Sequence, residues 1–285
     1  MNNTELYDQI RAEIEEALSF WGEKAIDDDL YEHSIGMFQD KIQKLGSFRL
    51  YHYSPLREIY HLFGLENEMI HLSGNTTLND LYEGIPRIEG EEDYNSLMEE
   101  DIAKMYCFTE ANDNYLMWSH YADSHKGICI EYDLSLLEDD VLRKQIFPVI
   151  YTKERKIGRN CKSIAKSIKA LKEAIQKDYV YDVGETLDDL LPLLLYKGNV
   201  WQYEKEWRLV FTMKTIYDMN AKKYYSDLIS FPCISAIYMG TRIKPLNEGM
   251  IRDLCIRMNK TKPVDLYKMK MEKEGYGLIA EKVSI

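Results

Sequence analysis

From residue 47 onward, short apolar segments alternate with short segments of helical character. The apolar segments are rich in aromatic and β-branched residues, as strands are, and they include FRLYHYS, MIHLS, MYCFT, ICIEYD, IFPVIY, WRLVF and ISAIYMG. The intervening helices do not recur at the regular spacing that a doubly wound parallel sheet requires. The pattern therefore predicts an α+β domain over residues 47–285, with a mixed or antiparallel central sheet and flanking helices.

The first 46 residues have a different pattern, with apolar side chains at helical spacing. The first series is Leu6, Ile10, Ile14 and Leu18, and a second series after an acidic break is Tyr31, Ile35, Phe38, Ile42 and Leu45. Gly46 stands where a glycine commonly ends a helix. We predict an N-terminal helical pair over residues 1–46 that packs on the core as a layer.

Several helix boundaries in the larger part can also be predicted. Ser54 followed by Pro55 is typical of a helix N-terminus, so we expect a short helix to Phe63 that ends at Gly64. A second helix is expected around residues 97–104, before the strand MYCFT. A leucine-rich helix with Pro192 inside it is expected before residue 201.

Composition bounds the class of protein. The formal charge is -12 and the pI is near 5.1, which disfavours non-specific binding to nucleic acid or anionic membranes. The five cysteines form no CxxC pair, the N-terminus does not resemble a secretory signal, and no apolar run approaches the ~20 residues of a membrane span. We expect a cytoplasmic protein with reduced thiols and no membrane association. The lysine-rich segment 153–177 is the one basic section.

Two clusters in the first half carry polar residues that a simple core would not use. His52 lies between Tyr51 and Tyr53 in an apolar strand, where it is either a hydrogen-bonded core residue or a functional group. The loop segment Asn79, Asp80 and Glu83 is either an Asx-type turn with a solvated acid or part of a binding site.

A third cluster combines a short aromatic helix with a strand. Trp118, His120 and Tyr121 fall on the helix, and Glu131 is placed in a strand that is otherwise apolar. A buried carboxylate must be paired, hydrogen-bonded or protonated. His120 and His125 are five residues apart, which is not the spacing of a helical zinc site, so we expect no metal there.

The fourth cluster is WQYEKEWRLVF, in which acids precede a buried strand. On an extended chain Glu204 and Glu206 project from one face, roughly 7 Å apart, and Arg208 continues that face. The two carboxylates would repel unless a cation, a sugar hydroxyl or Arg208 separates them. A salt bridge to Arg208 that locks the strand end is the structural alternative to a functional role.

With these clusters identified, the sequence resembles the bacterial family catalogued as domain of unknown function 2971. The segments that carry the resemblance, over about residues 48–240, are LYHYS, NDLYE, CFTE, NYLMWSHYADSHKGICIEYD, YEKEWRLV and IYMG. Leu81 departs from the family, where proline typically follows the asparagine–aspartate pair. The resemblance implies the fold and leaves the activity open.

The sequence is also similar, more distantly, to ADP-ribosyltransferases. Those enzymes carry a His or Arg in a first strand, then a short helix, an aromatic or Ser/Thr in a second strand, and a late Glu-x-Glu. The corresponding positions here are His52, the helix after Pro55, His71 with Ser73, and Glu204 with Glu206. His71 replaces a tyrosine that is common there.

The second resemblance implies NAD⁺ as substrate and a nucleotide-type small molecule as ligand. Glu206 would stabilise the ribosyl cation, Glu204 would orient or deprotonate the acceptor, and His52 would hold the ribose. Trp118 or Tyr121 would stack on a ring of the ligand. A defence or toxin role is compatible with such chemistry.

Two other functions are left open by the residues. In a metal-dependent nuclease, Asp80, Glu83, Glu131 and Glu206 would converge on Mg²⁺, and the basic segment 153–177 would hold a phosphate backbone. In a non-enzymatic sensor or partner-binding module, the same clusters would bind without catalysis. Neither GxGxxG nor GxxxxGK[ST] occurs.

Overall fold

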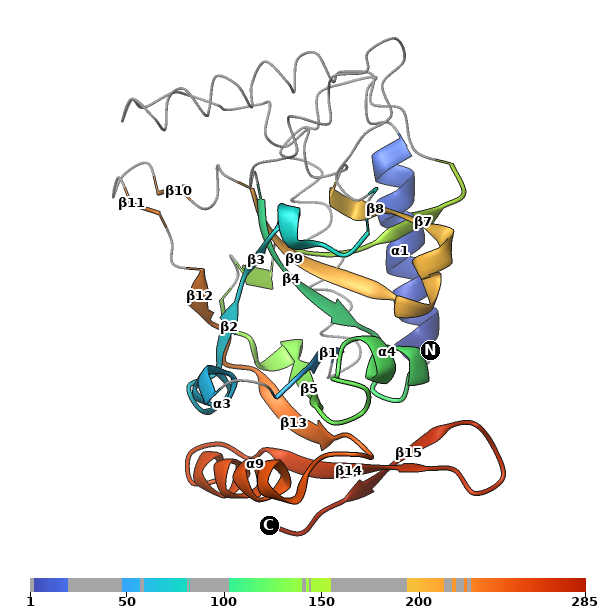
Figure 1. Ribbon diagram of the computed structural model, residues 1–285. Helices are drawn as coiled ribbons and strands as arrows, with labels where there is room; N and C mark the ends of the chain where they lie inside the picture. Colours follow the sequence, from blue (N-terminus) through green and yellow to red (C-terminus); the bar gives the residue numbers. More distant parts are fainter. Residues whose placement is uncertain are drawn as a thin grey trace.

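The predicted α+β fold is confirmed. A computed structural model describes residues 3–19, 48–56, 59–80, 82, 103–139, 142–143, 145–154, 194–212, 217–218, 223–224 and 227–285 (Figure 1). Within these ranges the largest sheet has nine strands, and helices lie on its faces and ends.

The nine-stranded sheet has the order β15-β14-β13-β5-β1-β4-β9-β6, with β3 beside β4. Its strands are β1 (Arg49–Ser54), β3 (Ser73–Gly74), β4 (Ala103–Thr109), β5 (Ile128–Asp133), β6 (Ile146–Pro148), β9 (Glu206–Thr212), β13 (Ile234–Met239), β14 (Asp265–Met271) and β15 (Leu278–Lys282). All pairs are antiparallel except β13 with β14, which the helix α9 (Pro245–Met258) connects. A mostly antiparallel sheet with one helical crossover is the mixed sheet that the sequence predicts.

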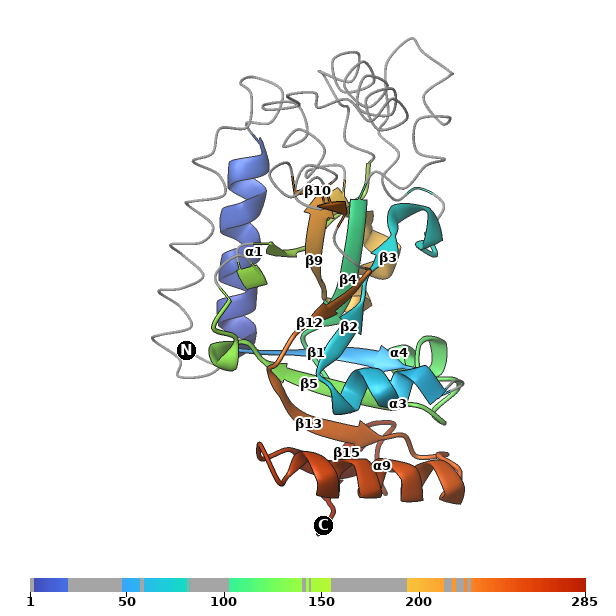
Figure 2. The same ribbon diagram turned by 90° about the vertical axis from the view of Figure 1, so that its left-hand side faces the viewer.

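The sheet has a seam between β1 and β4. These strands share a single residue pair, Tyr51 with Thr109, whereas β1 pairs with β5, and β4 with β9, along their whole lengths. In Figure 2, β4 and β9 run across the direction of β1, β5 and β13. Beyond the shared pair, β1 and β4 diverge without further pairing.

Several short elements place residues next to the seam between β1 and β4. The helix α3 (Ile59–Glu66) is followed by β2 (Met69–His71), which pairs with β12 (Leu228–Ser230). The 3-10 helix η1 (Asn75–Thr77) follows β3, and a second one, η5 (Asn199–Glu204), precedes β9. The remaining elements are α4 (Tyr115–His120), η3 (Leu134–Leu136), the pair β7 (Ile150–Thr152) and β8 (Tyr196–Gly198), and the pair β10 (Tyr217–Asp218) and β11 (Lys223–Tyr224).

The predicted first helix is α1 (Asn3–Ser19), and it belongs to the main core. The whole of its predicted apolar stripe is buried. The Tyr7 ring packs edge-on against Phe48 and Trp207, and the Arg11 guanidinium bonds Glu110 at 2.7 Å. The second helix of the predicted pair lies outside the described residues, as do the leucine-rich helix around Pro192 and the segment 155–177.

Two predicted helix boundaries are wrong. Ser54 ends β1 and its hydroxyl bonds the Pro55 carbonyl, so it does not cap a helix. Gly64 does not end α3 but lies inside it, where a Cβ would stand 3.2 Å from the Met69 carbonyl oxygen. A glycine at this position therefore allows the chain entering β2 to approach the helix.

Other differences concern element ends. Ala103 and Lys104 are the first residues of β4, not the last of a helix. The segment MIHLS divides into β2 and β3 because its two parts pair with different strands, β12 and β4. The segment IFPVIY likewise divides into β6 and β7, which pair with β9 and β8.

The cysteines and the lengths of the helices bear on two further expectations for the described residues. Cys107, Cys129, Cys233 and Cys255 are free thiols, and all but Cys107 are buried. Cys161 lies outside the described part. None of the helices described is both long and apolar enough to cross a membrane.

Candidate functional site

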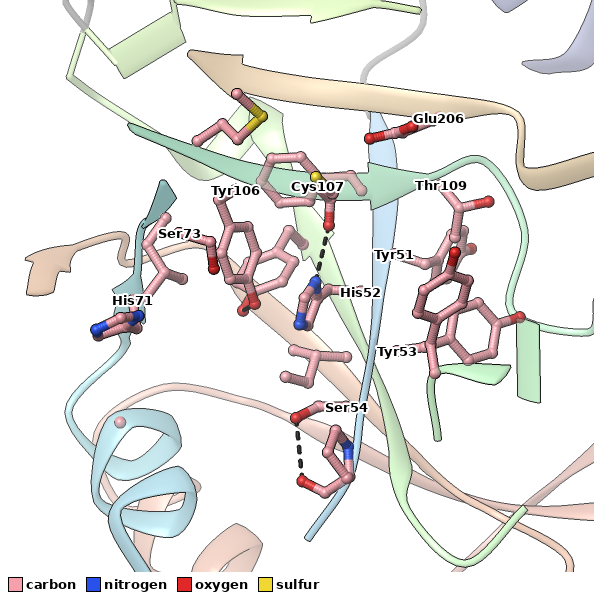
Figure 3. A pocket seen from close by; sticks show the side chains of 18 of the residues that line it. Tyr51, His52, Tyr53, Ser54, His71, Ser73, Tyr106, Cys107, Thr109 and Glu206 are labelled. Atoms are coloured by element: carbon pink, nitrogen blue, oxygen red, sulfur yellow. Dashed lines mark hydrogen bonds between the residues drawn. The ribbon is translucent and has the colours of Figure 1, made fainter. Parts of the chain in front are cut away.

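A cavity of about 750 Å³ lies where β1 and β4 part. Its walls come from β1, α3, β2, β4, β5 and η5, so segments far apart in the sequence meet around it (Figure 3). The size is within the ~300–1,000 Å³ that is usual for pockets holding a drug-sized ligand. Its lining combines charged groups, which are Lys197, Glu204 and Glu206, with other polar side chains and with many aromatic and aliphatic ones.

His52 projects into this cavity from β1, on the face shared with Ile130. Its Nδ1 lies 2.8 Å from the carbonyl oxygen of Cys107, and its ring stacks on Tyr106 at 4.2 Å between centroids. Because a carbonyl oxygen only accepts, Nδ1 carries the proton, and in the neutral ring Nε2 then has the lone pair. The histidine bridges the seam between the two halves of the sheet and has a fixed tautomer.

The charged end of the cavity is built around the Lys197 ammonium group. Lys197 Nζ donates to Glu204 at 2.6 Å and to Glu206 at 2.9 Å. Lys197, Glu204 and Glu206 are exposed by only 5%, 2% and 4%. Two buried carboxylates so close together need a cation between them, and Lys197 is that cation.

Glu206 is also paired with Arg208. The guanidinium binds the carboxylate in a bidentate manner, with Nε 2.7 Å from Oε1 and Nη2 3.0 Å from Oε2. Arg208 is fully buried, and its Nη1 donates to the Leu194 carbonyl at 2.5 Å. The salt bridge considered as the structural alternative is therefore present, and the cavity still reaches Glu206.

Glu204 reaches the site by a turn and not along a strand. It ends η5, and Lys205 follows with a φ of 45°, a left-handed conformation that is costly for a side chain with a Cβ. The expectation that Glu204 and Glu206 share one face of an extended strand is therefore wrong. Thr109 Oγ1 fixes the turn by donating to the Glu204 carbonyl at 2.5 Å.

Two polar side chains cover Glu204. The Tyr121 hydroxyl donates to Glu204 Oε1 at 2.5 Å, and the Asn79 amide donates to the Tyr121 hydroxyl at 2.6 Å. Asn79 is exposed, Tyr121 is half-buried and Glu204 is buried. Exposure therefore falls stepwise from the surface to the carboxylate.

Burial and charge set the protonation of this end of the cavity. Burial alone would lower the pKa of Lys197, but the charges of Glu206 and Glu204 outweigh it and raise that pKa above its ordinary value. Burial raises the pKa of Glu206 in spite of the nearby ammonium. Burial and the Glu206 carboxylate raise the pKa of the Cys107 thiol, which also lines the cavity. At neutral pH Lys197 is charged and Cys107 is a thiol.

The structure brings together most of the residues that the sequence singles out. The predicted site residues that line the cavity are His52, Tyr53, His71, Ser73, Asn79, Tyr121, Glu204 and Glu206. Those placed elsewhere are Asp80, Trp118, His120, Glu131 and Arg208, and Glu83 lies outside the described residues. Tyr53 contributes its ring and directs its hydroxyl to the Ala111 carbonyl.

Trp118 and His120 do not point into the cavity. Trp118 is fully buried, donates to the Asn112 carbonyl and packs edge-on against Tyr53. His120 is exposed on the last turn of α4. Of the three aromatic residues predicted on this helix, only Tyr121 reaches the site, from the position that caps the helix.

Glu131 lies on the opposite face of the sheet from His52. It stands opposite Tyr51 in the β1–β5 register, whereas His52 stands opposite Ile130, and successive residues of a strand alternate faces. Its carboxylate accepts hydrogen bonds from Tyr238 at 2.6 Å and Ser235 at 2.8 Å. The paired carboxylate that the sequence requires is found, but away from the cavity.

Lys197 is the site residue that the sequence reasoning missed. It lies in the apolar run LLLYKGNVW, where a lysine is as unexpected as the glutamates at the start of β9. A buried lysine requires an anionic partner, and the required cation for Glu204 and Glu206 was seven to nine residues upstream. The unexpected lysine and the unexpected glutamates could therefore have been predicted to form ion pairs with each other.

Comparison with known proteins gives one match. Residues 117–209 match the family model described as Protein of unknown function (DUF2971). The matched segment runs from within α4 into β9, and it contains Tyr121, Lys197, Glu204 and Glu206. The match supports the resemblance to this family that the sequence motifs carry. No curated protein and no solved structure matches the chain.

Proposed function

We propose that the protein cleaves the bond between nicotinamide and ribose in NAD⁺, with chemistry of the ADP-ribosyltransferase type. The observation that carries the proposal is the meeting of His52, His71, Ser73, Glu204 and Glu206 around one cavity. These residues come from β1, β2, β3, the end of η5 and the start of β9, in the chain order that the similarity to ADP-ribosyltransferases implies. The site has room for a nucleotide-sized ligand.

The chemistry needs negative charge beside the sugar. As the bond to nicotinamide breaks, positive charge develops on the ribose, and a preorganised carboxylate lowers the energy of that transition state. Glu206 is fixed on both oxygens by Arg208 and Lys197. We assign it the role of facing the developing cation and accepting a hydrogen bond from a ribose hydroxyl.

Glu204 is suited to handle a proton. Each of its oxygens accepts one hydrogen bond from a side chain, Oε1 from Tyr121 and Oε2 from Lys197. An ionised carboxylate has about four acceptor positions, so Glu204 retains capacity to take a proton from the acceptor. Glu204 is accordingly assigned as the base that activates the nucleophile.

The remaining groups orient the ligand. His52 lines the cavity with a ring held by Cys107 and Tyr106, and we assign it to orient the ribose. His71 and Ser73 are exposed at the other end of the cavity, where polar groups meet solvent. The aromatic and aliphatic walls between the two ends fit the flat rings of a dinucleotide.

The proposal is tested by NAD⁺ turnover in the purified full-length protein. We expect NAD⁺ to raise the melting temperature and to be consumed, with release of nicotinamide. Glu206→Gln should lower turnover by about 10²-fold or more, as loss of a transition-state contact does. The variant should lose some stability, because buried Lys197 and Arg208 lose a charged partner, but it should remain folded at the assay temperature. Glu68→Gln is the matched control, because Glu68 is also ion-paired, to Lys262 at 2.7 Å, but lies outside the cavity.

Failure of the proposal would be equally plain. If NAD⁺ neither raises the melting temperature nor is consumed, the assignment is wrong. Mg²⁺-dependent degradation of RNA or DNA would support the nuclease alternative in its place. The present geometry does not favour that alternative, because Glu206 lines the cavity and Glu131 does not, and the Glu131 carboxylate accepts hydrogen bonds from Tyr238 and Ser235.

A further inference from the structure

The cavity has an open end and a closed end. Phe63 and Leu228, at the α3 and β12 side, are 60% and 36% exposed, and His71 and Ser73 beside them are also exposed. The carboxylates at the other end are almost fully buried. A ligand that enters past Phe63 therefore meets Glu204 and Glu206 last.

Short hydrogen bonds close the inner end. Thr109 holds the Glu204 carbonyl, and Asn114 donates to the adjacent Tyr203 carbonyl at 2.6 Å. Tyr121 covers the Glu204 carboxylate and is itself held by Asn79. Glu204 is only 2% exposed, and it lines the cavity.

This arrangement limits what can reach the reacting carbon. Once a dinucleotide fills the cavity, any acceptor must share the space beside Glu204 with it. A protein side chain would have to bring its own backbone to a surface that Tyr121 and Asn79 cover. A water molecule needs only a site of about one probe sphere, with two to four polar partners, and the Glu204 and Glu206 carboxylates, which both line the cavity, supply two of them.

On these grounds, and resting on the proposed function, we infer that the acceptor is water and that the protein is an NAD⁺ glycohydrolase. The carbon–nitrogen bond breaks and its electron pair leaves with nicotinamide. A lone pair of the water oxygen forms the new carbon–oxygen bond at the anomeric carbon, and the water proton passes to Glu204 and then to solvent. NAD⁺ and water give ADP-ribose, nicotinamide and one proton, so no further reactant is required.

The inference is tested by following both products with the full-length protein and NAD⁺ labelled in the adenylate half. Agmatine, an alkyl guanidine, is added as a probe for transfer to arginine-like acceptors. We expect free ADP-ribose equimolar with nicotinamide, no agmatine adduct and no label in precipitated protein. Label on the protein or on agmatine would overturn the inference and leave the proposed function standing. Absence of NAD⁺ consumption would overturn both.

Two variants of Tyr121 test whether this side chain excludes larger acceptors. Tyr121→Ala removes the cover over Glu204, and we expect it to admit agmatine and to divert product into the adduct. Tyr121→Phe keeps the ring and loses only the hydroxyl, so we expect no adduct, even if turnover falls. Equal adduct yields from the two variants would contradict the assignment of Tyr121 as the side chain that excludes larger acceptors.

Discussion

Replacing Lys197 tests the construction of the site without assuming any activity. Lys197→Met keeps the length and apolar stem of the side chain and removes the ammonium group. Glu204 and Glu206 would then face each other in a buried space, with side chains exposed by 3% and 6%. Removal of one partner from a buried ion pair costs about 3–5 kcal/mol. For a chain of this size, at about 2 °C per kcal/mol, that predicts a fall in melting temperature of roughly 6–10 °C.

The loss of stability in Lys197→Met should depend on pH, in a direction that the pKa shifts determine. The pKa of Glu206 is already raised by burial, and removal of the ammonium should raise it further. A carboxyl group whose pKa is raised on folding contributes stability below its unfolded pKa, and this contribution is lost as the pH rises through the folded value. In the wild type, Lys197 stays charged over this range because its pKa is raised. The deficit of the variant should therefore be smaller at pH 5 than at pH 8.

The assay is thermal unfolding of the two proteins at both pH values. Lys282→Met is the control, because its ion pair with Asp265 is exposed to solvent and we expect no change in melting temperature. Adding Glu204→Gln to Lys197→Met should restore part of the stability by removing one of the two charges. A Lys197→Met protein as stable as the wild type at pH 8, or a deficit independent of pH, would refute the reasoning.

Three further predictions follow from packing and accessibility. Gly127→Ala should destabilise the protein by about 3 kcal/mol or more, because a Cβ would lie 2.2 Å from the Ser54 carbonyl oxygen and overpacking against backbone is poorly relieved. Urea unfolding measures this loss of stability. Arg11→Met should lower the melting temperature because it leaves the buried Glu110 carboxylate without its 2.7 Å partner in α1. In a variant lacking Cys161, alkylation of Cys107 should accelerate at alkaline pH, because burial raises the pKa of the thiol. NAD⁺ should slow the alkylation, and mass spectrometry measures the rate with and without NAD⁺.

The elements of the site could be predicted from the sequence because each has a local cause. The strand around His52 and the strand after Glu206 are apolar runs with β-branched and aromatic residues. Their convergence is also foreseeable, because charged groups in apolar strands need partners. The pairing of Arg208 with Glu206 follows from the period of two along β9.

What the sequence could not provide was register and turn conformation. Glu131 does not line the cavity, because its carboxylate is directed to Tyr238 and Ser235, and one residue of register would have reversed its face. The turn at Lys205 has a positive φ without a glycine, and it is held by contacts from Thr109 that are distant in sequence. The position of Lys197 between both carboxylates depends on the turn at the end of η5, which the sequence does not predict.

The seam between β1 and β4 divides the site between two strand ladders. His52 belongs to one ladder and Glu206 to the other, and β1 and β4 share only the Tyr51–Thr109 pair. The separation of the histidine and this acid therefore depends on side-chain contacts across the seam, such as His52 with the Cys107 carbonyl and Tyr106 with Tyr132. A ligand that contacts both groups at once would add a further link between the two ladders.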